Sequence, residues 1–280
     1  MKRIVTIQDI SCVGKCSLTV ALPIISAMGV ETSVIPTAVL STHTAFRDFT
    51  FRDLTADIEP ISKVWQQENI TFDAIYTGYL GSFEQLELMS RFFDTFKNEN
   101  TLVFVDPVMG DFGKLYAGFS SEFALAMANL CSKADIIVPN LTEASYMLGI
   151  PYCHNKYDKA YIQDILRRLT ALGAKKAVLT GVSLQPNMVG VMAYDSEEDR
   201  FFEYYREKID VTYHGTGDVF ASTCLGALVN GKTLEEALHI ATDYTVESIF
   251  QTEKDPNHRW YGVNFESSIP YLIERLYGKE

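Results

Sequence analysis

The sequence predicts an α/β protein with a mostly parallel sheet that is covered by helices on both faces. Short apolar runs alternate with amphipathic stretches along the whole chain, which is the pattern of strands joined by crossover helices. The chain has 280 residues, of which 47% are apolar and 21% are charged, so it can bury a large core and is not expected to be disordered. Because no Gly/Ser-rich linker or internal repeat interrupts it, we expect a single domain over residues 1–280.

Strands are expected where short apolar runs end at polar or turn-forming residues, and helices where apolar residues recur at helical spacing. The expected strands are 4–7, 32–40, 74–79, 102–105, 136–138 and 176–180, followed by a hairpin pair at 189–194 and 201–205. The expected helices are 17–28, 58–68, 83–97, 121–131, 141–148, 158–172, 217–229 and 233–250. The polar and aromatic segment 46–54 and the loop 111–119 are candidate flaps over a binding site.

The chain is strongly acidic: it has 24 Lys and Arg against 36 Asp and Glu, which gives a formal net charge of −12. This balance argues against a nucleic-acid partner, because such proteins normally present a basic surface. It leaves phosphorylated ligands open, because backbone N–H groups bind phosphate without the help of Lys or Arg.

The cysteines and the apolar segments indicate a cytoplasmic protein without a membrane partner. The five cysteines are widely scattered and include no Cys-x-x-Cys pair, so neither a disulfide framework nor a zinc site is expected. The basic N-terminus is a poor signal peptide, because Gln8, Asp9 and Lys15 interrupt the apolar residues that follow it. The segment 18–30 is too short to span a bilayer and contains Pro23.

Polar residues follow several of the expected strands at their carboxyl ends, where parallel α/β sheets bind their ligands. These residues are Gln8-Asp9 after the first strand, Thr77-Gly78-Tyr79-Leu80-Gly81-Ser82, Asp106-Pro107-Val108-Met109-Gly110 and Pro139-Asn140-Leu141-Thr142-Glu143. Gathered at one edge of a sheet, they suggest a binding site. Taken singly, each of them is explained equally well as a helix cap or a turn.

The segment 226–233 matches the Walker A phosphate-binding pattern but is expected to be structural. A Walker A loop follows a buried strand and opens a helix, whereas residues 221–229 have the pattern of a helix. Gly231 is placed to end that helix, and Thr233 and Glu236 have the spacing of a capping box for the next helix.

A better candidate for phosphate binding is the sequence Gly215-Thr216-Gly217-Asp218. Its two glycines allow a close approach of the backbone to a ligand, and an apolar helix follows directly. Successive N–H groups at a helix N-terminus form an anion site. Asp218 is then either a helix cap or a base held beside a bound phosphate, and the tetrapeptide alone does not decide between these.

In this order along the chain, the segments resemble those of the ribokinase-like superfamily and, within it, of the pyridoxal kinase family. The resemblance covers residues 4 to about 250, and its segments are jointly specific. They are Ile7-Gln8, Ser41-Thr42-His43-Thr44, Thr77-Gly78-Tyr79-Leu80-Gly81-Ser82, Asp106-Pro107-Val108-Met109-Gly110, Pro139-Asn140-Leu141-Thr142-Glu143 and Gly215-Thr216-Gly217-Asp218. The resemblance implies a three-layer α/β/α fold and ATP-dependent phosphorylation of the 5′-hydroxymethyl group of a vitamin B6 vitamer (pyridoxal, pyridoxine or pyridoxamine).

The resemblance also implies a role for individual residues. Asp218 would be the general base, and the N–H groups of Gly215, Thr216 and Gly217 would form an anion hole for the transferred phosphoryl group. Mg²⁺ would be bound by Asp106 and Glu143. ATP would be contacted by Asp106, Glu143, Asn140, Thr180, Gly181, Gly215 and Gly217. The pyridine ring would be surrounded by Asp9, Ser41, His43, Thr44 and Tyr79. The family further implies a homodimer, and K⁺ is a candidate second cation.

Three positions depart from the family pattern, which leaves the preferred vitamer and the nucleotide contacts open. Asp9 stands where bacterial relatives often have serine, Lys15-Cys16-Ser17 replaces a more glycine-rich turn, and Thr180-Gly181 stands where some relatives have a lysine. Two alternatives remain: hydroxymethylpyrimidine kinase of thiamine synthesis, and a non-catalytic B6-binding protein. The first usually has a glycine-rich first turn and a cysteine in the last motif, both absent here, and the intact Gly-Thr-Gly-Asp argues against the second.

Overall fold

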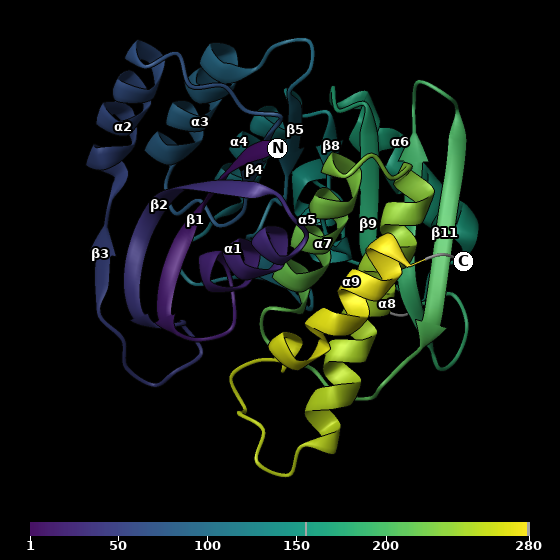
Figure 1. Ribbon diagram of the computed structural model, residues 1–280. Coiled ribbons are helices and arrows are strands. Elements are labelled where there is room, and N and C mark those ends of the chain that lie inside the picture. Colours follow the sequence, from purple (N-terminus) through teal and green to yellow (C-terminus); the bar gives the residue numbers. More distant parts are fainter. Residues whose placement is uncertain (155, 279–280) are drawn as a thin grey trace. The chain divides into compact units, whose positions relative to one another are not determined.

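The computed structural model describes residues 1–154 and 156–278 (Figure 1). The chain divides into two compact units. The first, which we call the split unit, consists of Met1–Asp73 together with Arg206–Glu280, and the second, the central unit, is Ala74–Tyr205. The expectation of a single kinase domain over residues 1–280 stays a prediction.

The sheet of the split unit is built on two long parallel strands, β1 (Arg3–Val13) and β2 (Glu31–Thr42). The short strand β3 (Phe51–Asp53) runs antiparallel to β2 and lies in the segment that was expected to be a flap. The register of β1 and β2 is regular from Arg3 opposite Glu31 as far as Gln8, and it shifts before Ile10. Strand β1 therefore extends well beyond the expected 4–7, because polar residues continue the buried strand.

Helices cover the sheet of the split unit and pack in succession on one another. Helix α1 (Leu18–Ala27) packs on β1 and β2, and α2 (Thr55–Gln67) packs on β2. Helix α7 (Thr216–Val229) packs against α1, and α8 (Leu234–Lys254) packs against α7 (Figure 1). The short η1 (Phe265–Ser268) and α9 (Ile269–Tyr277), which the sequence pattern did not reveal, complete this unit against α8.

An ion-pair network holds the last helix to α8. Asp243 of α8 is 3% exposed and accepts hydrogen bonds from Arg206 and from Arg275 of α9, the latter at 2.7 Å. The two arginines are partly exposed, and together they compensate the charge of the buried Asp243. The network therefore fixes the C-terminal helix to the rest of the split unit.

The sheet of the central unit is parallel over four strands: β4 (Ala74–Thr77), β5 (Leu102–Val105), β8 (Ile136–Ile137) and β9 (Lys176–Val182). Strand β10 (Met188–Asp195) runs antiparallel to β9, and β11 (Arg200–Glu207) is its next neighbour. This pair confirms the predicted hairpin. The loop that was expected to be a flap contains a small ribbon of β6 (Gly110–Asp111) and β7 (Lys114–Leu115).

The helices of the central unit begin at capping side chains, which explains their positions in the sequence. They are α3 (Phe83–Phe96), α4 (Ser121–Cys131), α5 (Leu141–Leu148) and α6 (Lys159–Ala171). Ser82, Ser120, Asn140 and Asp158 each accept a hydrogen bond from the N–H group three residues on. Helix α5 ends at Gly149, whose φ of 61° is left-handed.

The structural interpretation of the Walker A match is confirmed. Helix α7 ends at Val229, Gly231 adopts a φ of 86°, and Thr233 caps α8 in a reciprocal capping box with Glu236. Within residues 1–154 and 156–278, no helix combines the length and the apolar character that crossing a bilayer would require.

Candidate functional site

The site residues predicted from the sequence form two sets, one within each unit. The set in the split unit consists of Asp9, Ser41, His43, Thr44, Gly215, Thr216, Gly217 and Asp218. The set in the central unit consists of Tyr79, Asp106, Asn140, Glu143, Thr180 and Gly181.

Asp9 lies at an irregularity of the first strand. The register of β1 and β2 shifts between Gln8 and Ile10, where Gln8 lies opposite Pro36, a residue without an N–H group. The Asp9 side chain is only 5% exposed and accepts a hydrogen bond from the Ser11 hydroxyl at 3.0 Å. Burial raises the pKa of Asp9, and hydrogen bonds from the hydroxyls of Ser17 and Ser11 offset part of this effect.

Gly215 places Asp218 in the first turn of α7. Gly215 is the N-cap, with a left-handed φ of 81°, and a Cβ atom there would lie 1.8 Å from the carbonyl oxygen of Lys15. Only glycine fits such a position. The first N–H groups of a helix have no partner within the helix, so this start, which includes Thr216 and Gly217, is suited to bind an anion.

The pKa of Asp218 lies well above the usual value of a carboxyl group. Burial raises the pKa of Asp218 to about 7, the charge of Asp9 adds to this, and a hydrogen bond from the backbone N–H of Ser17 offsets part of it. A carboxyl group with a pKa near the working pH is both ionised and basic enough to accept a proton. Cys16 lies close to both carboxylates: burial, with the charges of Asp218 and Asp9, raises its pKa to about 12, so the thiol is protonated and unreactive.

Ser17 connects the two carboxylates and was missed in the sequence. Its backbone N–H donates to Asp218 and its hydroxyl donates to Asp9. Ser17 adopts a φ of 50°, an unusual value for a residue with a side chain, directly before α1. Strained backbone of this kind gathers at functional sites. The role depends on backbone geometry, for which the sequence contains no signal.

His43 is buried, and both of its ring nitrogens are bonded to backbone atoms. Nδ1 accepts a hydrogen bond from the N–H of Ala45 at 3.2 Å, so Nε2 carries the proton and donates it to the carbonyl oxygen of Tyr261 at 3.0 Å. Burial lowers the pKa of His43, which favours this neutral form. Ser41 and Thr44 are exposed nearby, and the Ser41 hydroxyl accepts from the N–H of Thr50 at 2.9 Å.

In the central unit, Glu143 joins the loop after β5 to the start of α5. Its two carboxylate oxygens accept from the N–H of Asn140 at 2.8 Å and from the N–H of Met109 at 3.1 Å. The Asn140 amide donates in turn to the carbonyl oxygen of Gly110 at 2.8 Å. Burial raises the pKa of Glu143 to about 8, and the charge of Asp111 adds to this.

Asp106 and Glu143 form the pair of carboxylates that was predicted to bind a metal ion. Both carboxyl groups are buried. The pKa of the Cys131 thiol is raised first by burial and then by the charges of Glu143 and Asp106, so both carboxylates lie close to the Cys131 sulfur. Over residues 1–154 and 156–278, no group of three or more His, Cys, Asp or Glu side chains has the arrangement of a metal site. Two carboxylates still fit Mg²⁺, because this ion usually takes one or two from the protein and completes its shell with phosphate oxygens and water.

The remaining predicted residues of the central unit lie at two places. Thr180 and Asn140 form an isolated parallel β-bridge, and the N–H of Thr180 donates to the carbonyl oxygen of Pro139 at 3.0 Å. Thr180 therefore lies beside the start of α5. Gly181 follows it with a left-handed φ of 69°. Tyr79 is partly buried, and its ring centroid lies 5.6 Å from that of Phe119 in the loop that was expected to be a flap.

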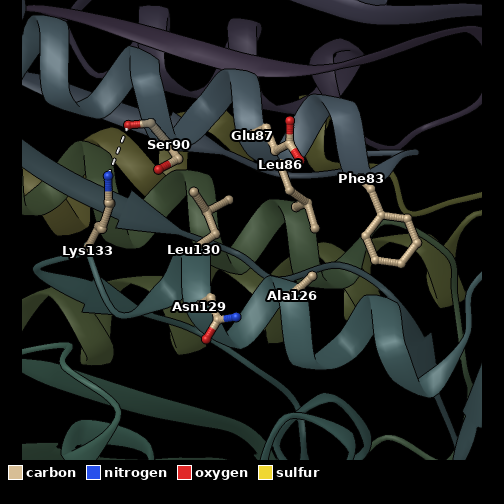
Figure 2. Close-up of a pocket in the computed structure, with 8 residues that line it drawn as sticks. All are labelled: Phe83, Leu86, Glu87, Ser90, Ala126, Asn129, Leu130 and Lys133. Carbon is tan, nitrogen blue, oxygen red and sulfur yellow. Dashed lines mark hydrogen bonds between the residues drawn. The ribbon is translucent and has the colours of Figure 1, made fainter.

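A separate groove lies between α3 and α4 of the central unit (Figure 2). Its volume is about 320 Å³, and it is lined by Phe83, Leu86, Glu87, Ser90, Ala126, Asn129, Leu130 and Lys133. Lys133 is bound to the carboxylate of Asp94 at 2.8 Å and reaches the carbonyl oxygen of Ser90 at 3.5 Å. None of the predicted site residues lines this groove.

A mostly parallel α/β fold, with carboxylates after its strands and a glycine-rich helix start that carries an aspartate, defines a ribokinase-like protein. The model of one family, phosphomethylpyrimidine kinase, matches residues 22–263. The chain belongs to this family.

Similar proteins confirm the resemblance to pyridoxal kinases. The pyridoxine/pyridoxal/pyridoxamine kinase of Bordetella avium is 27% identical over 262 residues, covering 88% of this chain and 84% of the relative. A putative phosphomethylpyrimidine kinase from Bacteroides thetaiotaomicron, crystallised with pyridoxal, has 37% identity and a TM-score of 0.92 over 97% of this chain and 95% of that one. Pyridoxal kinase from Lactobacillus plantarum has 29% identity and a TM-score of 0.89 over 98% and 97% of the two chains. The ribokinase-like fold is confirmed.

Proposed function

We propose that this protein catalyses the ATP-dependent phosphorylation of the 5′-hydroxymethyl group of a vitamin B6 vitamer: pyridoxal, pyridoxine or pyridoxamine. The observation that carries the proposal is Asp218, held in the first turn of α7 with a pKa of about 7, directly after the glycines at 215 and 217. The similarity to pyridoxal kinases supports the proposal, because those proteins are named for the same reaction.

In the split unit, Asp218 takes the proton of the substrate hydroxyl as this oxygen attacks the terminal phosphorus of ATP. The bond between that phosphorus and its bridging oxygen breaks, and ADP is the leaving group. The N–H groups of residues 215–217 stabilise the negative charge on the phosphoryl oxygens during transfer. Asp9, Ser41 and Thr44 line the ring of the substrate, and His43 belongs to the same site with both of its ring nitrogens bonded to backbone atoms. A positioned base typically contributes about 10²- to 10⁴-fold to the rate.

In the central unit, Asp106 and Glu143 are proposed to hold Mg²⁺, in part through water, because both Glu143 oxygens accept backbone N–H groups. When bound, the ion supplies positive charge against the phosphates, which an acidic protein lacks. Asn140, Thr180 and Gly181 are proposed to lie along the nucleotide, and Tyr79 along the substrate. K⁺, a homodimer and a cytoplasmic location belong to the same proposal.

The reaction is tested by incubating the protein with Mg-ATP and, separately, pyridoxal, pyridoxine, pyridoxamine and hydroxymethylpyrimidine, and by following the phosphorylated product. We expect product from at least one B6 vitamer. Product from hydroxymethylpyrimidine alone would transfer the assignment to the kinase of thiamine synthesis. Binding of B6 without product from any acceptor would make the protein a non-catalytic binder.

The metal role is tested with Glu143→Gln. Glutamine retains one oxygen to accept a backbone N–H but removes the charge, so the Mg²⁺ concentration that gives half-maximal rate should rise. An unchanged Mg²⁺ titration would refute the role of Glu143 in metal binding. Thermal unfolding of the same variant reports whether the hydrogen bonds to residues 109 and 140 are kept.

A further inference from the structure

A cluster of aromatic rings surrounds His43 in the split unit, and the reaction described above makes no use of most of it. The ring centroid of His43 lies 4.9 Å from those of Phe46 and His214 and 5.9 Å from that of Trp260. Phe46 and Trp260 are in mutual contact at 4.6 Å. The cluster thus joins the loop after β2, the residue before Gly215 and a segment near the C-terminus.

Trp260 is 56% exposed within this cluster, although the indole is a large apolar group. Phe46, its partner, is partly buried. An exposed indole gains little from packing, and single exposed apolar residues are common. Trp260 differs from other exposed apolar residues in its neighbours, because one of them, His43, belongs to the predicted acceptor site.

Two sets of contacts hold the segment that carries Trp260. On one side, the Nε2–H group of His43 donates to the carbonyl oxygen of Tyr261 at 3.0 Å. On the other side, the Lys15 ammonium donates to Asn264 at 3.0 Å and to Glu266 at 2.9 Å. The backbone of Gly262 lies so close to Lys15 that a Cβ atom there would be 2.4 Å from the Lys15 Cβ. The indole is therefore presented from a fixed backbone.

The cluster is next to the residues proposed to bind and activate the acceptor. Asp9 and His43 are within electrostatic reach of each other, and so are Asp9 and Asp218. His214 directly precedes Gly215, the N-cap of α7. A planar ring whose hydroxymethyl group lies at Asp218 would have the aromatic cluster beside it.

We propose that Trp260 and Phe46 form an aromatic wall for the planar ring of the acceptor, and that His43 is a positioning residue that holds this wall through the Tyr261 carbonyl. Both His43 nitrogens are bonded to backbone atoms, so it does not offer either of them to the substrate. The inference rests on the proposed function, since it assigns the part of the acceptor that the wall contacts.

The size of the effect follows from the energy of aromatic pairs. Offset or edge-to-face contacts between rings correspond to roughly 2- to 12-fold in affinity. Trp260→Ala should therefore raise the KM for the vitamer by about this factor and leave the KM for ATP unchanged. Trp260→Phe keeps a ring and should recover most of the loss.

The fluorescence of Trp260 provides a direct measurement. The chain has two tryptophans, and the other, Trp65, lies on α2, where it packs against Phe72 at 5.4 Å. In a Trp65→Phe protein all indole emission comes from Trp260, and titration with pyridoxine should quench or shift it saturably. The matched control is Trp260→Phe, in which Trp65 alone emits and should not respond.

The positioning role of His43 is tested in the same Trp65→Phe background. His43→Ala should lower the fluorescence anisotropy of Trp260 in the free protein and raise the KM for pyridoxine. His43→Gln, which can still donate to the Tyr261 carbonyl, should restore both values. Equal anisotropy in all three proteins would overturn this role.

The outcomes separate the wall from the reaction. If the wild type phosphorylates B6 vitamers but Trp260→Ala has an unchanged KM and Trp260 emission ignores pyridoxine, the wall is refuted and the proposed function stands. If no vitamer is phosphorylated yet Trp260 emission responds saturably, the proposed function fails and the wall is supported. No product together with no response would overturn both.

Discussion

The pKa of Asp218 predicts how the rate depends on pH, and the Asp9 charge gives a way to shift it. The base must be ionised to accept a proton, and its pKa is raised to about 7 by burial and by Asp9. kcat/KM should therefore rise as pH increases through about 7 and then level off. In Asp9→Asn, one of the two causes of the raised pKa is removed, so the rise should move to lower pH.

The magnitude follows from the titration of a single group. With a pKa of about 7, roughly a tenth of Asp218 is ionised one pH unit below that value and roughly nine tenths one unit above it. The wild type at pH 6 should therefore have roughly a tenth of its maximal kcat/KM. At the plateau, Asp218→Asn should turn over at least about 10²-fold more slowly.

The assay is initial-rate phosphorylation of pyridoxine between pH 5.5 and 8.5 at constant ionic strength. Asp218→Asn is the matched control, because ATP and pyridoxine titrate identically in its presence, so only the difference between the two profiles reports the base. Near-normal turnover of Asp218→Asn would refute the role of Asp218. An identical rise in the wild type and in Asp9→Asn would refute the electrostatic coupling of the two carboxylates.

Three further predictions concern the stability of the protein, the glycines at the start of α7 and the Walker A match. Because the pKa of Asp218 is raised from 3.8 to about 7 in the folded state, wild-type stability should fall as pH rises from about 4 to about 7 and level off above that. Urea unfolding at pH 5 and 8 should show a loss on the order of 2–4 kcal/mol, which Asp218→Asn should escape. Gly215→Ala, whose Cβ would meet a carbonyl oxygen at 1.8 Å, should lose roughly 10²-fold in turnover, whereas Gly217→Ala, which meets nothing within 4 Å, should keep normal stability. Lys232→Ala should leave the KM for ATP unchanged, and a raised KM would support the Walker A interpretation. Thr233→Ala removes the N-cap of α8 and should lower the free energy of unfolding by about 0.5–2 kcal/mol.

The order of strands and helices was predictable because the apolar periodicity along most of the chain is strong. Where the apolar pattern did not predict a strand correctly, the reason is physical. Strand β1 was expected to end at Ile7, but Gln8, Asp9 and Ser11 continue it in buried positions. A hydrophobic pattern does not recognise polar residues that are buried. Strand β3 is exposed at all three positions, so it has no pattern of buried apolar residues.

The candidate site was predictable where a side chain acts and its neighbours form a motif, as with Asp218. It was not predictable where the backbone acts. Ser17 contributes an N–H group from an unusual conformation, and Tyr261 contributes a carbonyl oxygen, an atom that every residue has. Trp260 has no motif around it in the sequence, because its partners in the cluster come from segments far away along the chain.

The split unit also constrains the order in which the protein can form during synthesis. Residues Ala74–Tyr205 are contiguous, so the central unit has all its residues before Arg206–Glu280 is made. Met1–Asp73 cannot complete its unit until Arg206–Glu280 has been made. The hydrogen bond between His43 and Tyr261, for example, joins residues that are 218 positions apart. Closing such long loops is slow, so a nascent chain exposes the first part of the split unit until residues 206–280 have been made. Asp9 is made early and Asp218 late, and a truncated chain therefore never assembles the proposed acceptor site.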